Sequence, residues 1–149
     1  GIGNSCCLRA VCDFLDGLDA DGLMPKTILY TLNPSDNAML ATLTGSFSES
    51  GVQKLQFGPA WWYNDHECGI RDNLDALGSY SLMSMSLGMT TDSRTILSFS
   101  RHDYFRRILC DYIGNRVERG ELPADMEFLG GVVTGISYRN ADKWIYGNE

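Results

Sequence analysis

A short polar stretch, Thr91-Asp92-Ser93-Arg94, carries residue types that are well suited to chemistry. Asp92 and Arg94 are two positions apart, so on an extended strand end their side chains point to the same side. A carboxylate there can ligate a divalent metal or take up a proton, and an arginine can hold an anion through two hydrogen bonds. Thr-Asp-Ser is also good helix-capping chemistry. The residues alone leave a functional pair and a structural cap open.

Two adjacent tryptophans, Trp61 and Trp62, form the second group of interest. Neighbouring side chains on a strand end point in opposite directions, so we expect one indole in the core and the other lining a pocket. The two histidines, His66 and His102, are too far apart in sequence for a local pair of metal ligands. A self-contained zinc site is therefore not expected.

The composition is that of one globular unit. The chain has 149 residues, of which 44% are hydrophobic and 21% charged. No window approaches the roughly 20 apolar residues that cross a bilayer, and the first residues lack a secretory pattern, so the cytosol is the expected compartment. The five cysteines are odd in number and form no CxxC pair, so we expect reduced thiols.

The formal net charge of -7 argues against a general nucleic-acid surface. Positive charge gathers only between positions 94 and 107, where four arginines and His102 occur. An anionic ligand would have to bind near these residues, although solvated charges on a helix surface explain the same pattern.

Short apolar segments alternate with amphipathic ones along the chain. Strands are predicted near residues 27–32, 54–58 and 86–91, each closed by turn residues. Helices are predicted between them and, after the last strand, over residues 102–119 and 125–146. The first strand is apolar on both faces, which is typical of a buried parallel sheet.

Strands separated by helices make an α/β fold built from βαβ units. About three such units cannot close an eight-stranded barrel, so the chain is either a small open sheet or a segment of a barrel. The functional groups of such a sheet lie at the carboxyl ends of its strands. The chain also begins at Gly1 without an initiator methionine, which fits a piece of a longer protein.

Several blocks resemble the uronate isomerase family in order and spacing. They are residues 23–30 (LMPKTILY), 57–65 (FGPAWWYND), 88–94 (GMTTDSR) and 101–110 (RHDYFRRILC). The resemblance runs from about Gly3 to Trp144. Small departures are Tyr63, Thr90 and Asp103, where the family usually has phenylalanine, leucine and glutamate. None of these departures changes Asp92 or Arg94.

The resemblance implies the C-terminal segment of a TIM-type (β/α)8 barrel of the amidohydrolase-like, metal-dependent class. By the same resemblance, Asp92 is the metal ligand on strand eight and a catalytic acid/base group. Arg94 is catalytic and binds substrate, while Trp61 and, with less support, Trp62 wall the sugar pocket. The implied cofactor is a divalent metal, and zinc is the metal that we expect. The family's His-x-His ligands and fifth-strand histidine have no counterpart in this chain, so most ligands belong elsewhere.

The implied activity is an intramolecular oxidoreduction, the isomerisation of D-glucuronate to D-fructuronate and of D-galacturonate to D-tagaturonate. We expect it of the full-length parent, with the 149-residue piece inactive alone. Two alternatives stay open, a non-catalytic half-barrel interaction domain and a metal-dependent hydrolase on the same barrel. The expected partners are a small hexuronate and either a second copy or a complementary half-barrel, with no nucleic acid and no membrane.

Overall fold

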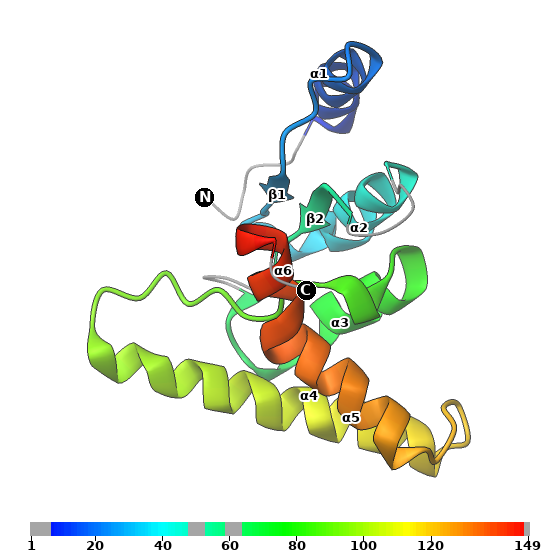
Figure 1. Ribbon diagram of the computed structural model, residues 1–149, viewed down its shortest axis with the longest axis vertical. Coiled ribbons are helices and arrows are strands. Elements are labelled where there is room, and N and C mark those ends of the chain that lie inside the picture. The colour runs from blue at the N-terminus through cyan, green and yellow to red at the C-terminus, as the bar shows by residue number, and fades with distance from the viewer. Residues whose placement is uncertain (1–6, 48–52, 59–63, 148–149) are drawn as a thin grey trace.

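The computed structural model describes residues 7–47, 53–58 and 64–147 (Figure 1). Short helices and two short strands alternate in the first half, and longer helices make up the second half. In chain order the elements are α1 (Leu8–Ala20), β1 (Thr27–Leu29), η1 (Pro34–Asp36), α2 (Asn37–Ser46), β2 (Leu55–Phe57), α3 (Glu67–Tyr80), η3 (Met83–Met85), η4 (Ile96–Phe99), α4 (Ser100–Glu118), α5 (Met126–Thr134), η5 (Gly135–Arg139) and α6 (Asn140–Tyr146).

The two strands form a small parallel sheet, with Ile28 opposite Gln56. Helix α2 connects them, so β1, α2 and β2 make one βαβ unit, as the alternation of patterns predicts. Strand β2 is buried along its length, whereas β1 is only half-buried. Both strands are shorter than expected. After β1 the chain turns at Asn33 into the 3-10 turn η1.

The third expected strand, at residues 86–91, is not formed in the described part of the chain. Its residues lie between η3 and η4, and Gly88 and Met89 are buried. No main-chain hydrogen bond is made by Leu87, Met89 or Thr90 to a described residue. A strand requires a neighbouring strand to complete its ladder, and no described segment pairs with residues 86–91.

Helix α3 links two hydrophobic clusters. Its residues Ala76 and Leu77 join the cluster that surrounds the sheet, together with Leu15 of α1 and Leu40 of α2. Ile70 and Leu74 of the same helix belong to the second cluster, whose other members are Met89, Phe105, Ile108, Leu109, Tyr112, Ile113, Leu129 and Ile136. The long helix α4 supplies half of that second set.

The C-terminal helices run as one nearly continuous rod beside α4 and the sheet (Figure 1). The single helix expected at 125–146 is divided, because the π-helical turn η5 separates α5 from α6. Asp125 caps the first turn by accepting a hydrogen bond from the Phe128 amide at 3.0 Å. Within α6, the side-chain amide of Asn140 donates hydrogen bonds to the main-chain oxygens of Ser84 and Ser86, both at 2.8 Å. The rod is thereby fixed to the start of the unpaired segment.

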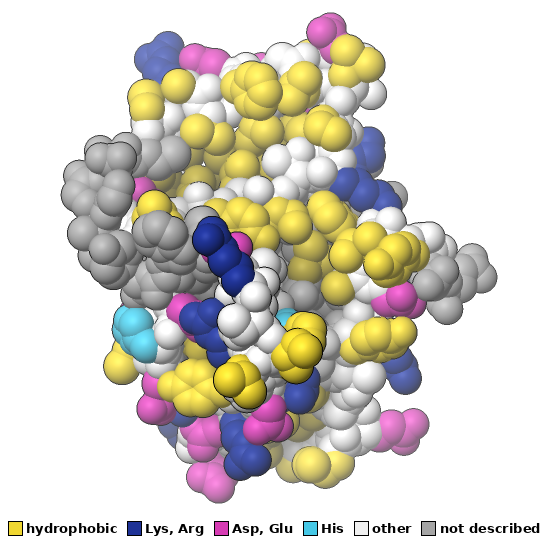
Figure 2. All heavy atoms as spheres, turned by 90° about the vertical axis from the view of Figure 1, so that its left-hand side faces the viewer, with side chains coloured by type: hydrophobic (Ala, Val, Ile, Leu, Met, Phe, Trp, Pro, Cys, Tyr) yellow, Lys and Arg dark blue, Asp and Glu magenta, His cyan; other side chains and the backbone are white. Residues whose placement is uncertain are grey.

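Figure 2 views the molecule from the side on which the loop before α4 lies, and hydrophobic side chains occupy much of the upper part of this face. On the loop itself, Ile96 and Leu97 are more than four-fifths exposed. Apolar surface of this kind is typical of a face that meets more polypeptide. None of the described helices has the length and apolar character needed to cross a membrane.

Candidate functional site

The carboxyl end of β1 is closed by its own hydrogen bonds. The Thr31 hydroxyl accepts a hydrogen bond from the Asn33 amide at 3.0 Å. The Asn33 side chain in turn accepts one from the Ser35 amide at 3.1 Å and so caps η1. Thr31 and Asn33 therefore act mainly in shaping the turn after the strand.

The chain that follows β2 returns to the same edge of the sheet. The Asn64 amide group donates to the main-chain oxygen of Thr31 at 3.3 Å, which ties the two strand ends together. Next to it, the Asp65 side chain is only 3% exposed. A buried carboxylate requires a partner, and Asp65 finds it in Arg101 at the start of α4. The expected pocket-wall residues Trp61 and Trp62 lie outside the described residues.

The stretch from Thr91 to Arg94 forms a sharp bend. Asp92 has φ of 47° and is the one non-glycine residue with positive φ among those described. Aspartate tolerates this left-handed conformation better than most residues, yet such a backbone typically costs about 1–3 kcal/mol. The hydroxyl groups of Thr91 and Ser93 are hydrogen-bonded to each other across the bend.

This bend changes the geometry predicted for the acidic and basic pair. The expectation that Asp92 and Arg94 point to one side assumed an extended strand end, and the left-handed Asp92 does not have one. Both side chains are exposed, and neither makes an ion pair or hydrogen bond to a described residue. Helix α4 begins only at Ser100, after this stretch. Asp92 and Arg94 therefore remain available to a ligand.

The arginines grouped in the sequence serve different purposes in the structure. Arg107 pairs with Asp103 one helical turn away at 2.8 Å on the surface, and this contact raises the pKa of Arg107 and lowers that of Asp103. Arg106 lies 3.8 Å from the same carboxylate. Arg101 is directed inward instead, where Nη1 donates to the main-chain oxygen of Thr91 at 2.7 Å. No single basic patch results.

Arg101 and Asp65 are the site residues that sequence reasoning missed. In the sequence, Arg101 appeared only among the four arginines and in the block 101–110, and Asp65 only at the end of the block 57–65. Their contact joins residues 36 positions apart, so no local pattern announces it. The pairing of Arg101 with Asp65 depends on the fold, which brings the loop after β2 close to the end of the 86–91 segment.

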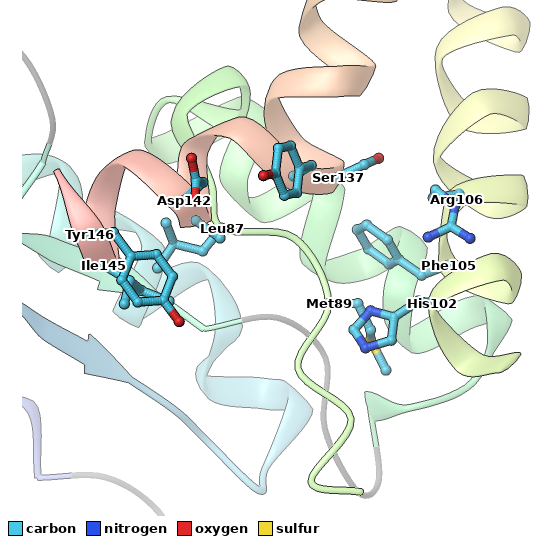
Figure 3. Close-up of a pocket in the computed structure, with 11 residues that line it drawn as sticks. Leu87, Met89, His102, Phe105, Arg106, Ser137, Asp142, Ile145 and Tyr146 are labelled. Atoms are coloured by element: carbon cyan, nitrogen blue, oxygen red, sulfur yellow. The ribbon is translucent and has the colours of Figure 1, made fainter. Parts of the chain in front are cut away.

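A cavity of about 220 Å³ lies beside residues 87–89, between α4 and α6 (Figure 3). His102, Phe105 and Arg106 of α4 lie on one side of it, and Ile145 and Tyr146 of α6 lie on the other. The segment that failed to pair as a strand runs between these two walls. The cavity is therefore a space along the free edge of that segment.

Polar side chains line the cavity, among them His102 and Ser137. Burial, and after it the positive charge of Arg106, lower the pKa of His102 from its ordinary value of 6.5. The Ser137 hydroxyl is buried in the π-helical turn and has no hydrogen-bond partner among the described residues. Buried polar atoms are nearly always paired in complete proteins. The Ser137 hydroxyl is thus a group that further polypeptide or a ligand could pair with.

The donor set for a metal is incomplete in this chain. Among residues 7–47, 53–58 and 64–147, no three His, Cys, Asp or Glu side chains come close enough to hold a metal ion. Asp92 is a single exposed carboxylate, whereas protein sites for divalent metals combine three or more ligands. The described residues by themselves do not fit the metal that the resemblance implies.

Comparisons with known proteins agree with the sequence motifs. The sequence profile described as glucuronate isomerase matches residues 1–145. Uronate isomerase of Caldanaerobacter subterraneus subsp. tengcongensis is 51% identical over 132 residues, which are 88% of this chain and 28% of that protein. Uronate isomerase of Halalkalibacterium halodurans is 52% identical over 140 residues, which are 93% of this chain and 30% of that protein.

A solved structure has the same fold over the matched part. The crystal structure of uronate isomerase from Thermotoga maritima superimposes with a TM-score of 0.80 at 31% identity, covering 93% of this chain and 29% of that one. The chain thus spans less than a third of the length of the relatives that it matches.

Proposed function

Since the chain belongs to the glucuronate isomerase family, we propose that it supplies one part of the active site of a uronate isomerase. The complete enzyme would convert D-glucuronate to D-fructuronate and D-galacturonate to D-tagaturonate. The part supplied here is the strand-end bend with Asp92 and Arg94. Trp61 and Trp62 remain our proposal for the wall of the sugar pocket.

Aldose to ketose conversion sets the chemical demands on these residues. A proton leaves C2, an enediol forms, and a proton is delivered to C1, so the site needs an acid/base group and a cation near the oxygens. Asp92 is a carboxylate and Arg94 a permanent cation able to hold the sugar carboxylate or an enediolate through two hydrogen bonds. Their freedom from other partners among the described residues is what such roles require.

The conformation of Asp92 is the observation that carries the proposal. A non-glycine residue in the left-handed region persists only where its surroundings enforce it, and such residues cluster at active sites. Here Thr91, Ser93 and Arg101 provide that enforcement. A simple helix cap would not need it, and no Thr91, Asp92 or Ser93 side chain caps η4 or α4.

We further propose that the complete enzyme is an amidohydrolase-like (β/α)8 barrel of which this chain is the C-terminal segment. The segment around the buried Met89 supports this, because its main chain makes no hydrogen bond to a described residue and a neighbouring strand would supply such partners. A divalent metal, zinc in our proposal, would take Asp92 as one ligand and its remaining ligands from outside this chain. The compartment that we assign to the complete enzyme is the cytosol.

The same segment, whose main chain from Leu87 to Thr90 is not seen to pair with a described strand, favours a second candidate function, that of a non-catalytic interaction domain. In that case the chain would bind a complementary half-barrel, or a second copy, along residues 87–90 without contributing to chemistry. The two functions differ in one respect. The isomerase needs Asp92 and Arg94, whereas the interaction domain needs only the segment and the cavity beside it.

A graft distinguishes the two functions. The matching 140-residue segment of the Halalkalibacterium halodurans uronate isomerase is replaced with this chain, and ketose formation from D-glucuronate and D-galacturonate is measured. We expect turnover by the graft and none by the 149-residue chain alone. A graft that matches the parent in circular dichroism and gel filtration yet forms no ketose would contradict the isomerase proposal and favour the interaction domain.

A further inference from the structure

Arg101 connects the loop after β2 with the bend at Asp92 through the two terminal nitrogens of its guanidinium group. Nη1 donates to the main-chain oxygen of Thr91 at 2.7 Å, and Nη2 pairs with the carboxylate of Asp65. Asp65 follows β2, and Thr91 immediately precedes the left-handed Asp92. One side chain thus bridges the loop after β2 and the bend that carries the candidate catalytic carboxylate.

The position of Arg101 suits a fixed support. It lies in the first turn of α4, a helix of 19 residues whose inner face is packed in the second hydrophobic cluster. The Asp65 side chain is 3% exposed, so the charge pair is anchored on its inner side. A planar guanidinium presents its donors in a fixed fork, which a lysine ammonium cannot reproduce.

The bend has little other support. Apart from the bond between the Thr91 and Ser93 hydroxyl groups, no hydrogen bond from a described residue reaches positions 91–94 except the one from Arg101. Asp92 would relax from its left-handed conformation if nothing held the preceding carbonyl group.

We infer that Arg101, held by Asp65, is a positioning residue that fixes the backbone at Asp92 and Arg94. The inference rests on the proposed function for the role of Asp92, but not for the mechanical connection itself. Arg101 acts through the Thr91 carbonyl group and does not touch the substrate. Two other roles for Arg101 predict different results, namely a plain stabilising ion pair and a direct contact with the sugar carboxylate.

Backbone motion in the 149-residue chain tests the mechanical connection. We compare ¹⁵N relaxation of the unchanged chain with Arg101→Gln and with Arg107→Gln, which removes the same charge from an exposed site on the same helix. The order parameters at residues 91–94 should fall from about 0.85 to below about 0.6 in Arg101→Gln. Arg107→Gln should leave them unchanged.

Order parameters that stay high in a folded Arg101→Gln variant would overturn the inference. If that variant does not fold, Arg101→Lys takes its place, because it keeps the charge and loses the fork. Intermediate values at residues 91–94 are then expected, and values equal to those of the unchanged chain would again overturn the inference. Asp65→Asn should change the same residues in the same direction.

Kinetics of the graft described above test the consequence for catalysis. Arg101→Gln should lower kcat by about 10–100-fold, the usual effect of losing a group that orients another, with KM within about twofold. A higher KM at unchanged kcat would mean that Arg101 binds substrate, and the positioning role would be wrong. A graft that is inactive before any substitution contradicts the proposed function instead, while the relaxation data still decide the mechanical connection.

Discussion

The indole Nε1 of Trp144 donates a hydrogen bond to the main-chain oxygen of Gln53, 2.9 Å away and 91 positions earlier in the chain. Both residues are buried. Lys26 adds to this contact, because its ammonium group donates to the Trp144 carbonyl group and lies 5.8 Å from the centre of the indole ring. Helix α6 is therefore attached to the chain just before β1 and just before β2, at the end of the sheet opposite to the candidate site.

Trp144→Phe should weaken this attachment while keeping most of the apolar packing. Losing the indole N–H removes a buried hydrogen bond, and the smaller ring leaves space behind. We expect the free energy of unfolding to fall by about 1–3 kcal/mol, measured by urea denaturation. The matched control is Tyr146→Phe on the same helix, where the side chain is 74% exposed and the change should stay within about 0.5 kcal/mol. Equal stability of the two variants would mean that the Trp144 contact contributes nothing.

Gly88 is a place where only glycine fits. Its φ is +73°, and a Cβ atom there would lie 2.3 Å from the main-chain oxygen of Ile136 in η5. Gly88→Ala should therefore destabilise the chain by about 2 kcal/mol or more, because both the backbone and its neighbour would have to shift. Thermal and urea unfolding measure the change.

Gly130→Ala is the control for this substitution. Gly130 lies within α5, and a Cβ atom there would meet nothing within 4 Å. Alanine should stabilise the helix by about 0.5–1 kcal/mol, because it restricts the unfolded chain. If Gly88→Ala were as stable as Gly130→Ala, the close approach of the 86–91 segment to η5 would be incorrect.

His102 should make stability depend on pH in the acidic range. Burial, with Arg106 as the second cause, lowers the pKa of His102 below 6.5, so the native chain binds fewer protons than the unfolded one. The stability linked to His102 is then present above about pH 6.5 and is lost as the pH falls through the lowered pKa. Titration of the imidazole Hε1 signal by NMR gives the pKa directly.

Arg106→Gln separates the two causes. The pKa of His102 should rise in this variant yet remain below 6.5, because burial is the larger cause and is unchanged. Arg107→Gln, which removes an exposed charge paired with Asp103, should leave the pKa where it was. A pKa of His102 at or above 6.5 in the unchanged chain would show that the imidazole is not buried in the cavity as described.

Local patterns predicted much of the secondary structure, because helices and strands follow from hydrophobic periodicity and caps. The parallel pairing of β1 with β2 follows from two short apolar runs separated by a helix. Residues 86–91 pair with no described strand, and their own sequence could not predict this, because a strand exists only through its neighbour. The π-helical turn η5 was also unpredictable, since Gly88, from a distant part of the chain, packs closely against its main chain.

The candidate site shows the same division between local and distant information. Asp92 and Arg94 stand out by residue type and position, whereas the left-handed bend at Asp92 depends on support from elsewhere. That support comes from Arg101 and Asp65, whose contact joins two separate loops. The sequence therefore predicted the residue types of the candidate site, but it did not predict their geometry.

Asp92→Asn in the graft tests the central claim most directly. Asparagine has the same shape and tolerates the left-handed conformation, so the bend should persist while the negative charge is lost. Asp103→Asn, which removes an exposed carboxylate on α4, is the matched control. We predict that Asp92→Asn lowers kcat for ketose formation from D-glucuronate by about 100-fold or more, with Asp103→Asn within about twofold of the unsubstituted graft. Near-normal turnover by a folded Asp92→Asn graft would contradict the account.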